Sequence, residues 1–285
     1  MADREERAAQ AARHNALMKG AFATETKASA EQARIYEEGQ ARDIAVGDPR
    51  FEATETLVTT AFIPEALHRY AKGDVVVVDP ASFTRPGGAY EDGAFGPEQV
   101  ICSESNLYQI LCGLKEAYYD KNRDYRRGQL CTDRAVYVPR VVFPRDGALR
   151  YADVTVMAEP LRARALENHR SERECDAALA GRIDALMRIA VHNECETLIC
   201  GAFACGRLGY DPRQVASLFR GWIDEHPGAI GRVVFAVPRT CFDAFDELFG
   251  APQQEQPAAP VAIAEEEDVF DASAIELPEG VTLRA

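Results

Sequence analysis

The chain has 285 residues, of which 47% are apolar and 27% charged, values typical of a soluble protein large enough to bury its own core. No apolar run approaches the roughly 20 residues that cross a bilayer, which excludes an integral membrane protein. The 46 acidic side chains outnumber the 32 basic ones and give a net charge of −14, so we expect no nonspecific binding of nucleic acid. The polar amino terminus lacks the apolar core of a secretory signal, and we expect a cytoplasmic protein.

The eight cysteines are expected to be free thiols, because a chain without an export signal stays in a reducing compartment. Cys195, Cys200 and Cys205 recur at five-residue steps, but no CxxC pair accompanies them and the chain has only five histidines. We therefore expect neither a metal site nor a resident cofactor.

Residues 1–45 are rich in Ala, Arg, Glu and Gln, and we expect one or two helices packed outside the sheet. Over 46–250, β-branched runs alternate with amphipathic segments, the order of an α/β fold. Continuous apolar runs, typical of a sheet covered on both faces, predict strands at 74–79, 135–143, 153–157, 197–200 and 233–237.

Three helices are predicted from capping residues and apolar periodicity. Ser105 precedes an apolar face that runs from Leu107 to Tyr118, and a second face spans 179–190. Asp211 and Pro212 form a third start signal, followed by apolar residues at steps of three and four up to Ile223.

The last segment, 251–285, is rich in Pro, Gln, Ala and acids, with eight acidic residues against one arginine. This composition predicts a solvated, disordered acidic tail. A short partner-binding element around 269–277 is the alternative.

A long glycine-rich segment, 79–108, follows the first predicted strand. Gly87 and Gly88 allow positive φ and a close approach of backbone N–H groups to a ligand, which favours a cradle for an anion or a ribose. The alternative is a tight loop in which these glycines only turn the chain.

A second glycine-rich segment, 197–212, carries Gly201, Gly206 and Gly209. Their spacing matches neither GxGxxG nor the GxxxxGK[ST] phosphate loop. A loop that leaves a strand and enters a helix is still well placed for a diphosphate, through free N–H groups and the helix dipole. Both loops leave the carboxyl ends of strands, where ligands of open α/β sheets bind.

The strings PGGAYEDGA and EQVICSESNLY, with GAFACG and VPRVVFPRD further on, resemble the signatures of microbial-type poly(ADP-ribose) glycohydrolases, which are macrodomain proteins. The resemblance covers roughly 10–250. It implies a three-layer α/β/α mixed sheet over 46–250, preceded by a helical extension over 1–45, and ADP-ribose or an ADP-ribosylated macromolecule as the ligand. The ligand-binding residues that it implies are Asp79, Ser82, Gly87, Gly88, Ala89, Gly201, Ala202, Phe203, Cys205, Gly206, Arg207 and Leu208.

This chain departs from the family pattern at the implied catalytic residues. The family's Gln-Glu-Glu falls on Pro97, Glu98 and Gln99, so the family acid is an amide here. An amide donates a hydrogen bond but cannot deliver a proton. We hypothesise that Asp92 or Glu91 from the same loop replaces the missing acid; the alternative is a solvated loop tip.

The other departures are Ala89 for a third glycine, Asp79 for an asparagine, and Leu208 for an aromatic ring. Two functions stay open at this stage. One is an ADP-ribosyl glycohydrolase of altered or weakened catalysis, and the other is a module that binds ADP-ribose without hydrolysis. For Arg207, Phe203 and Cys205, a surface ion pair or core packing is the alternative to ligand binding.

Overall fold

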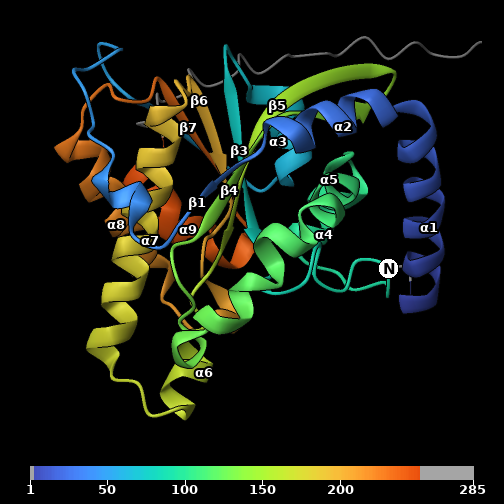
Figure 1. Cartoon of the computed structure of the whole chain (residues 1–285). Helices are drawn as coiled ribbons and strands as arrows, with labels where there is room; N and C mark the ends of the chain where they lie inside the picture. Colours follow the sequence, from blue (N-terminus) through green and yellow to red (C-terminus); the bar gives the residue numbers. More distant parts are fainter. Residues whose placement is uncertain (1–2, 251–285) are drawn as a thin grey trace, which may run out of the picture. The chain divides into compact units, whose positions relative to one another are not determined.

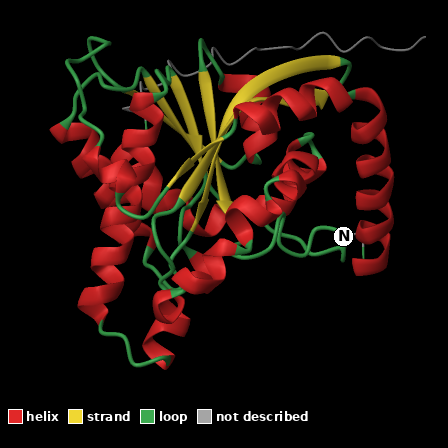
Figure 2. Cartoon of the chain, viewed as in Figure 1, coloured by secondary structure: helices red, strands yellow, loops and turns green. Residues whose placement is uncertain are grey.

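The computed structural model describes residues 3–250, so the predicted acidic tail lies outside the described residues. The chain divides into two units, 1–251 and 252–285, and every element that the structure describes lies in the first. Its centre is a seven-stranded sheet (Figure 2). The strands are β1 (Arg34–Tyr36), β2 (Glu55–Thr59), β3 (Val75–Ala81), β4 (Ala135–Arg145), β5 (Ala148–Ala158), β6 (Thr197–Cys200) and β7 (Arg232–Ala236).

The sheet is mixed, with the order β1-β4-β5-β3-β6-β7-β2. The five strands from β5 to β2 run parallel, whereas β4 pairs antiparallel with β5 and β1 pairs antiparallel with β4. All five predicted strands are present. The sequence pattern missed β1 and β2, which lie at the two edges of the sheet and carry partly exposed, less apolar side chains.

Helices cover both faces of the sheet, which confirms the predicted three-layer α/β/α mixed-sheet fold (Figure 1). Strand β3 shows why, because Val76 and Val78 enter one core while Val75 and Val77 enter the other. The first face carries α6 (Arg162–Glu167), α7 (Glu172–His192), α8 (Pro212–Glu225) and α9 (Arg239–Phe249). The second carries α3 (Ile63–Tyr70), α4 (Pro97–Ser103) and α5 (Leu107–Gly113).

The predicted helix starts are present with local differences. The Asp211 carboxylate accepts hydrogen bonds from the N–H groups of Arg213 and Gln214, at 2.7 and 3.4 Å, and so caps α8. The Ser105 hydroxyl accepts from the N–H of Leu107, the first residue of α5. After α5 the chain widens into a π-helical turn, η2 (Lys115–Tyr119), which turns Tyr118 into the core.

The amino-terminal segment forms two helices, α1 (Arg4–Ala21) and α2 (Ala23–Gln32), and then contributes β1 to the sheet. Short 3₁₀ turns complete the fold at η1 (Gln40–Asp43), η3 (Lys121–Tyr125), η4 (Arg127–Gln129) and η5 (Gly206–Leu208). Within residues 3–250 no helix has the length and apolar character that a bilayer crossing requires.

Candidate ligand-binding and catalytic site

Both glycine-rich loops line one cavity of about 770 Å³. It lies at the carboxyl end of the parallel strands, and the exits of β3 and β5 form part of its wall. The two loops therefore converge on a single site, as the sequence predicted. Of the predicted residues, the cavity wall contains Ser82, Gly88, Ala89, Glu98, Gln99, Ala202, Cys205, Arg207 and Leu208.

The first glycine-rich loop needs a glycine at Gly88, where it passes the side chains of Glu98 and Gln99. Gly87 and Gly88 have φ of +61° and +59°. A Cβ on Gly88 would lie 2.9 Å from Gln99 Nε2 and 3.0 Å from Glu98 Oε2. Gly88 therefore provides both the left-handed turn and the room that these two side chains occupy. Gly87 is buried against the Tyr108 ring rather than in the cavity wall.

Glu98 lies in the first turn of α4 and is 5% exposed. Its Oε2 accepts hydrogen bonds from the backbone N–H of Ser82 at 3.0 Å and from Gln99 Nε2 at 3.3 Å. Its Oε1 is buried and has no hydrogen-bond partner among residues 3–250. Burial raises the pKa of Glu98 well above its usual range, and the nearby charge of Asp79 adds to the effect.

Asp79 lies near the end of β3 and is fully buried. Neither carboxyl oxygen has a hydrogen-bond partner among the described residues. Burial raises the pKa of Asp79 well above its usual range, and the charge of Glu159 raises it further. Asp79 is therefore not in the cavity wall, but it lies close enough to Glu98 for its charge to raise the pKa of that carboxyl group.

Sequence reasoning missed Glu159, a third acidic residue of the site. It follows directly after β5 and lines the cavity, and its Oε1 accepts a hydrogen bond from the N–H of Ala204 in the second loop. Burial raises the pKa of Glu159 to about 7, although this hydrogen bond and the charge of Arg207 oppose the shift. The position of Glu159 at the exit of a central parallel strand was the signal that could have identified it.

The Gln99 amide is held by the loop that it faces. Its Nε2 donates to the carbonyl oxygen of Gly87 at 3.1 Å as well as to Glu98. Gln99 also lines a second cavity of about 300 Å³ that α1 and α4 share. The side chain thus contributes hydrogen bonding, but no proton, at the position where the resemblance implies an acid.

Part of the second loop lies away from the main cavity. Phe203 is 2% exposed and packs in the core beneath the loop, because the chain turns at Ala204 with φ of +60°. Gly201 and Gly206 line an adjoining cavity instead. The first N–H groups of α8 are bound by Asp211, so the expected free donors at this helix start are occupied.

The adjoining cavity has a volume of about 330 Å³ and its wall carries no ionisable groups except two cysteines. It shares with the main cavity Phe95, Gly96, Pro97, Ala202 and Cys205. The rings of Phe62 and Phe95 meet edge to face at its wall with centroids 6.3 Å apart, and each side chain is 55% exposed. This apolar surface suits a flat aromatic group.

The structure does not bring the two predicted replacement acids to Glu98. Asp92 lies at the loop tip, where its carboxylate pairs with Arg85 at 2.9 Å in solvent. Glu91 is exposed, and neither residue lines the main cavity. The turn at Gly93, with φ of +71°, directs this tip toward α1. Within residues 3–250, no group of three His, Cys, Asp or Glu side chains is arranged to hold a metal ion.

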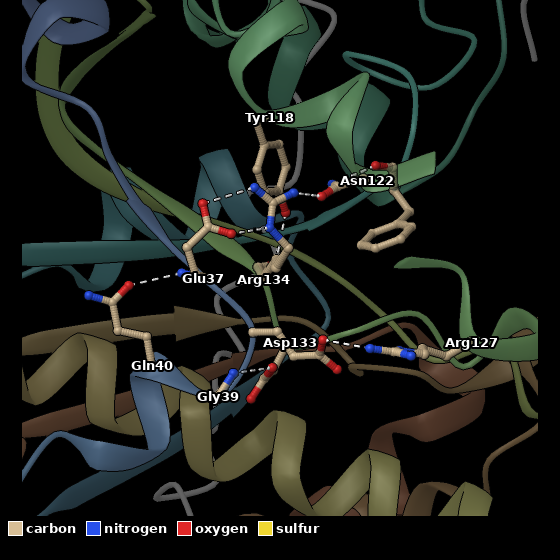
Figure 3. Close-up of polar contacts among 10 residues, drawn as sticks. Glu37, Gly39, Gln40, Tyr118, Asn122, Arg127, Asp133 and Arg134 are labelled. Atoms are coloured by element: carbon tan, nitrogen blue, oxygen red, sulfur yellow. Dashed lines mark hydrogen bonds and ion pairs between the residues drawn. The ribbon is translucent and has the colours of Figure 1, made fainter. Parts of the chain in front are cut away.

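A segment that the sequence did not single out, 126–131, closes the remaining side of the cavity with Arg126, Gln129 and Cys131. Nearby, buried Arg134 donates to Glu37 and to Asn122, and Asn122 in turn donates at 2.7 Å to the carbonyl oxygen of Phe83, another residue of the cavity wall (Figure 3). The cavity wall is therefore held by a buried polar network.

Comparisons with known proteins agree with this geometry. The family model described as microbial-type PARG, catalytic domain, matches residues 5–146. The crystal structure of poly(ADP-ribose) glycohydrolase from Thermomonospora curvata is similar, with 25% identity and a TM-score of 0.77 over 86% of this chain and 100% of that one.

The same enzyme bound to the inhibitor ADP-HPD gives 26% identity and a TM-score of 0.75, over 86% of this chain and 99% of that one. The glycohydrolase from Deinococcus radiodurans in complex with ADP-ribose gives 26% identity and a TM-score of 0.71, over 79% of this chain and 96% of that one. A search of curated protein sequences gave no match. From the family model and the solved structures together, the chain belongs to the microbial-type poly(ADP-ribose) glycohydrolase family.

Proposed function

We propose that this protein binds ADP-ribose and hydrolyses ADP-ribosyl bonds in the cytoplasm, without a resident cofactor or metal. The observation that carries the proposal is the single cavity lined by both glycine-rich loops, with buried Glu98 in its wall. Relatives of similar fold bind ADP-ribose and the inhibitor ADP-HPD. Catalysis is weaker than is typical of the family, because Gln99 replaces the implied acid.

The two connected cavities match the parts of ADP-ribose. Adenine fits the apolar cavity beside Phe62 and Phe95, since a purine base gains most from flat aromatic and aliphatic contacts. The diphosphate then passes the second loop beside Ala202 and Cys205, which line both cavities. The distal ribose reaches Glu98, whose free Oε1 can bind a ribose hydroxyl.

Hydrolysis of a ribosyl bond passes through a state resembling an oxocarbenium ion, which needs an activated water molecule and help for the leaving group. General acid help is worth roughly 10² to 10⁴ in rate. Gln99 cannot give that help. Of the remaining carboxyl groups of the cavity wall, Glu98 can orient the ribose, and Glu159, with a pKa of about 7, can accept a proton from water.

The test combines binding with turnover. We expect calorimetry to detect ADP-ribose binding, and we expect the protein to release ADP-ribose from at least one ADP-ribosylated substrate. In Glu98→Gln, release should fall by about 100-fold or more, because the position contacts the reacting sugar. Absence of binding at millimolar ADP-ribose would contradict the proposal, and so would a Glu98→Gln variant that keeps full activity.

A second function, binding of ADP-ribose without hydrolysis, is favoured by one observation. The Nε2 group of Gln99 donates to Glu98 and to Gly87, and an amide supplies no proton at the family position. Strong binding with no release from any substrate, together with release by Gln99→Glu, would assign this second function.

A further inference from the structure

The chemistry of the leaving group restricts which ADP-ribosyl bonds this site can break. Between two riboses the departing group is an alcohol, whose alkoxide is too basic to leave without a proton. In an ester between ribose C1″ and a side-chain carboxyl group, the departing group is a carboxylate with a pKa near ~4, which leaves unprotonated. Gln99, which cannot protonate a leaving group, is compatible with the ester and poorly suited to the alcohol.

We propose that this protein removes ADP-ribose esterified to Asp or Glu side chains of proteins, in preference to cleaving the ribose–ribose bonds of poly(ADP-ribose). The inference rests on the proposed function, for which it names the class of substrate.

Two guanidinium groups in the cavity wall suit a carboxylate leaving group. Arg126 comes from the segment before η4, and Arg207 comes from the second loop. Neither guanidinium forms a hydrogen bond or an ion pair with another residue of the described range, 3–250, although the charge of Arg207 acts on Glu159. Arginine binds carboxylates through two parallel N–H donors. The positive charges of Arg126 and Arg207 therefore stabilise the departing carboxylate, which needs no proton.

The segment that carries Arg126 is held in place by buried arginines. Arg182, 2% exposed, donates to the carbonyl oxygens of Leu130 and of Ala158, and so ties this segment to the end of β5. At the other end, the Arg134 guanidinium lies over the ring of Tyr125, which directly precedes Arg126, at 5.1 Å from the ring centroid. Side chains that are positioned before the substrate binds lose less entropy on binding.

The reaction balances without a further reactant. The C1″–O bond breaks and its electron pair leaves with the carboxylate, while the oxygen of a water molecule forms the new bond to C1″. The proton of that water passes to the Glu159 carboxylate and then to solvent. The products are ADP-ribose, the free side-chain carboxylate and one proton.

The experiment compares three substrates with the full-length protein at neutral pH. These are a peptide with ADP-ribose esterified to one glutamate, a peptide with ADP-ribose on a serine hydroxyl, and poly(ADP-ribose). We expect release from the ester to be at least about 100-fold faster than from the other two, after subtraction of spontaneous ester hydrolysis. Gln99→Glu should gain about 100-fold on poly(ADP-ribose) and change ester cleavage by less than about tenfold.

The arginines are tested separately. Arg126→Ala and Arg207→Ala should each reduce kcat/KM for the ester by about tenfold or more. Arg150→Ala is the matched control, since its side chain is exposed on β5 outside all cavity walls described above, and it should leave turnover unchanged. Equal rates on ester and ribose–ribose bonds overturn the inference and leave the proposed function standing. Binding of ADP-ribose without ester release also overturns it, whereas absence of binding removes the proposed function itself.

Discussion

At the scale of single residues, the site is dominated by three acidic side chains whose pKa values are all raised. Asp79, Glu98 and Glu159 lie where β3, α4 and β5 meet, and burial is the largest cause of the shift for each. A buried carboxyl group prefers its neutral form, and each ionised neighbour strengthens that preference. The folded protein therefore holds protons at pH values where the unfolded chain has lost them.

This linkage predicts that the protein is most stable at mildly acidic pH. Glu159 has a pKa of about 7 when folded against an ordinary 4.5. Its contribution is therefore fully present below about pH 4.5 and is lost as pH rises through 7, by up to about 3 kcal/mol. We expect Glu159→Gln, which keeps an oxygen for the Ala204 N–H, to flatten the fall in unfolding free energy between pH 5 and 8. Urea denaturation at a series of pH values measures this free energy of unfolding.

The control for this measurement is Glu167→Gln, which changes a carboxylate on the surface of α6. Its stability profile should parallel that of the wild type. Asp79 and Glu98 shift in the same direction, so the Glu159→Gln profile keeps a residual slope. Profiles of equal slope in Glu159→Gln and the wild type would contradict the prediction.

Sequence reasoning identified some site residues because their spacing is local. Gln99 and Glu98 follow the glycine pair by a fixed short distance, and the structure brings these residues into contact. Glu159 and Arg126 reach the cavity only through strand order and a long connection, which no local pattern encodes. For Phe203 the resemblance implies ligand contact and core packing is the alternative; the structure places its side chain in the core, next to the left-handed turn at Ala204.

At the scale of elements, α1 supports the tip of the first glycine-rich loop. Arg4 Nε donates to the carbonyl oxygen of Asp92 and Arg7 Nε to that of Gly93, each at 2.8 Å. A Cβ on Gly93 would lie 2.0 Å from the Arg4 carbonyl oxygen, so helix and loop are in direct backbone contact. The helix thus limits the motion of the loop that carries Gly88 and leads to Glu98.

We expect the double variant Arg4→Ala/Arg7→Ala to bind ADP-ribose about three- to tenfold more weakly, because the loop loses two charge-assisted hydrogen bonds and must be ordered on binding. Calorimetry measures the affinity. Arg13→Ala on the exposed side of α1 is the matched control. An unchanged dissociation constant in the double variant would show that the loop keeps its position without these contacts.

The elements that the sequence predicted are those with strong periodic signals. The buried central strands are continuous apolar runs, and α8 has both a cap and an amphipathic face. The edge strands β1 and β2 are short and polar, and their pairing with β4 and β7 depends on tertiary contacts. The segment 1–45 was expected outside the sheet, yet its β1 extends it.

At the scale of the whole molecule, the described residues that line the two cavities of the proposed site all fall between 60 and 241. Phe249 is buried in the core at the end of α9, which marks the last core residue of the described range. The segment 251–285 carries eight acids against one arginine, and we expect this negative charge to repel an anionic ligand, with a strength that salt screens.

A chain ending at Gly250 should therefore bind ADP-ribose with an affinity within about threefold of the full chain at physiological salt, where the Debye length is about 8 Å. At low salt the shortened chain should bind slightly more tightly, because part of the repulsion is gone. Calorimetry at two salt concentrations measures both effects. A large loss of affinity at physiological salt would assign the tail a direct part in the site.

The side chain of Gln99 lines both the main cavity and the smaller cavity that α1 and α4 share. Ala94 and Phe95 also line both cavities, so the first glycine-rich loop and the start of α4 separate the main cavity from the amino-terminal helix. A small compound bound in the smaller cavity would contact Gln99 from the side opposite the main cavity. An inhibitor bound in this smaller cavity would therefore act on Gln99 without occupying the main cavity.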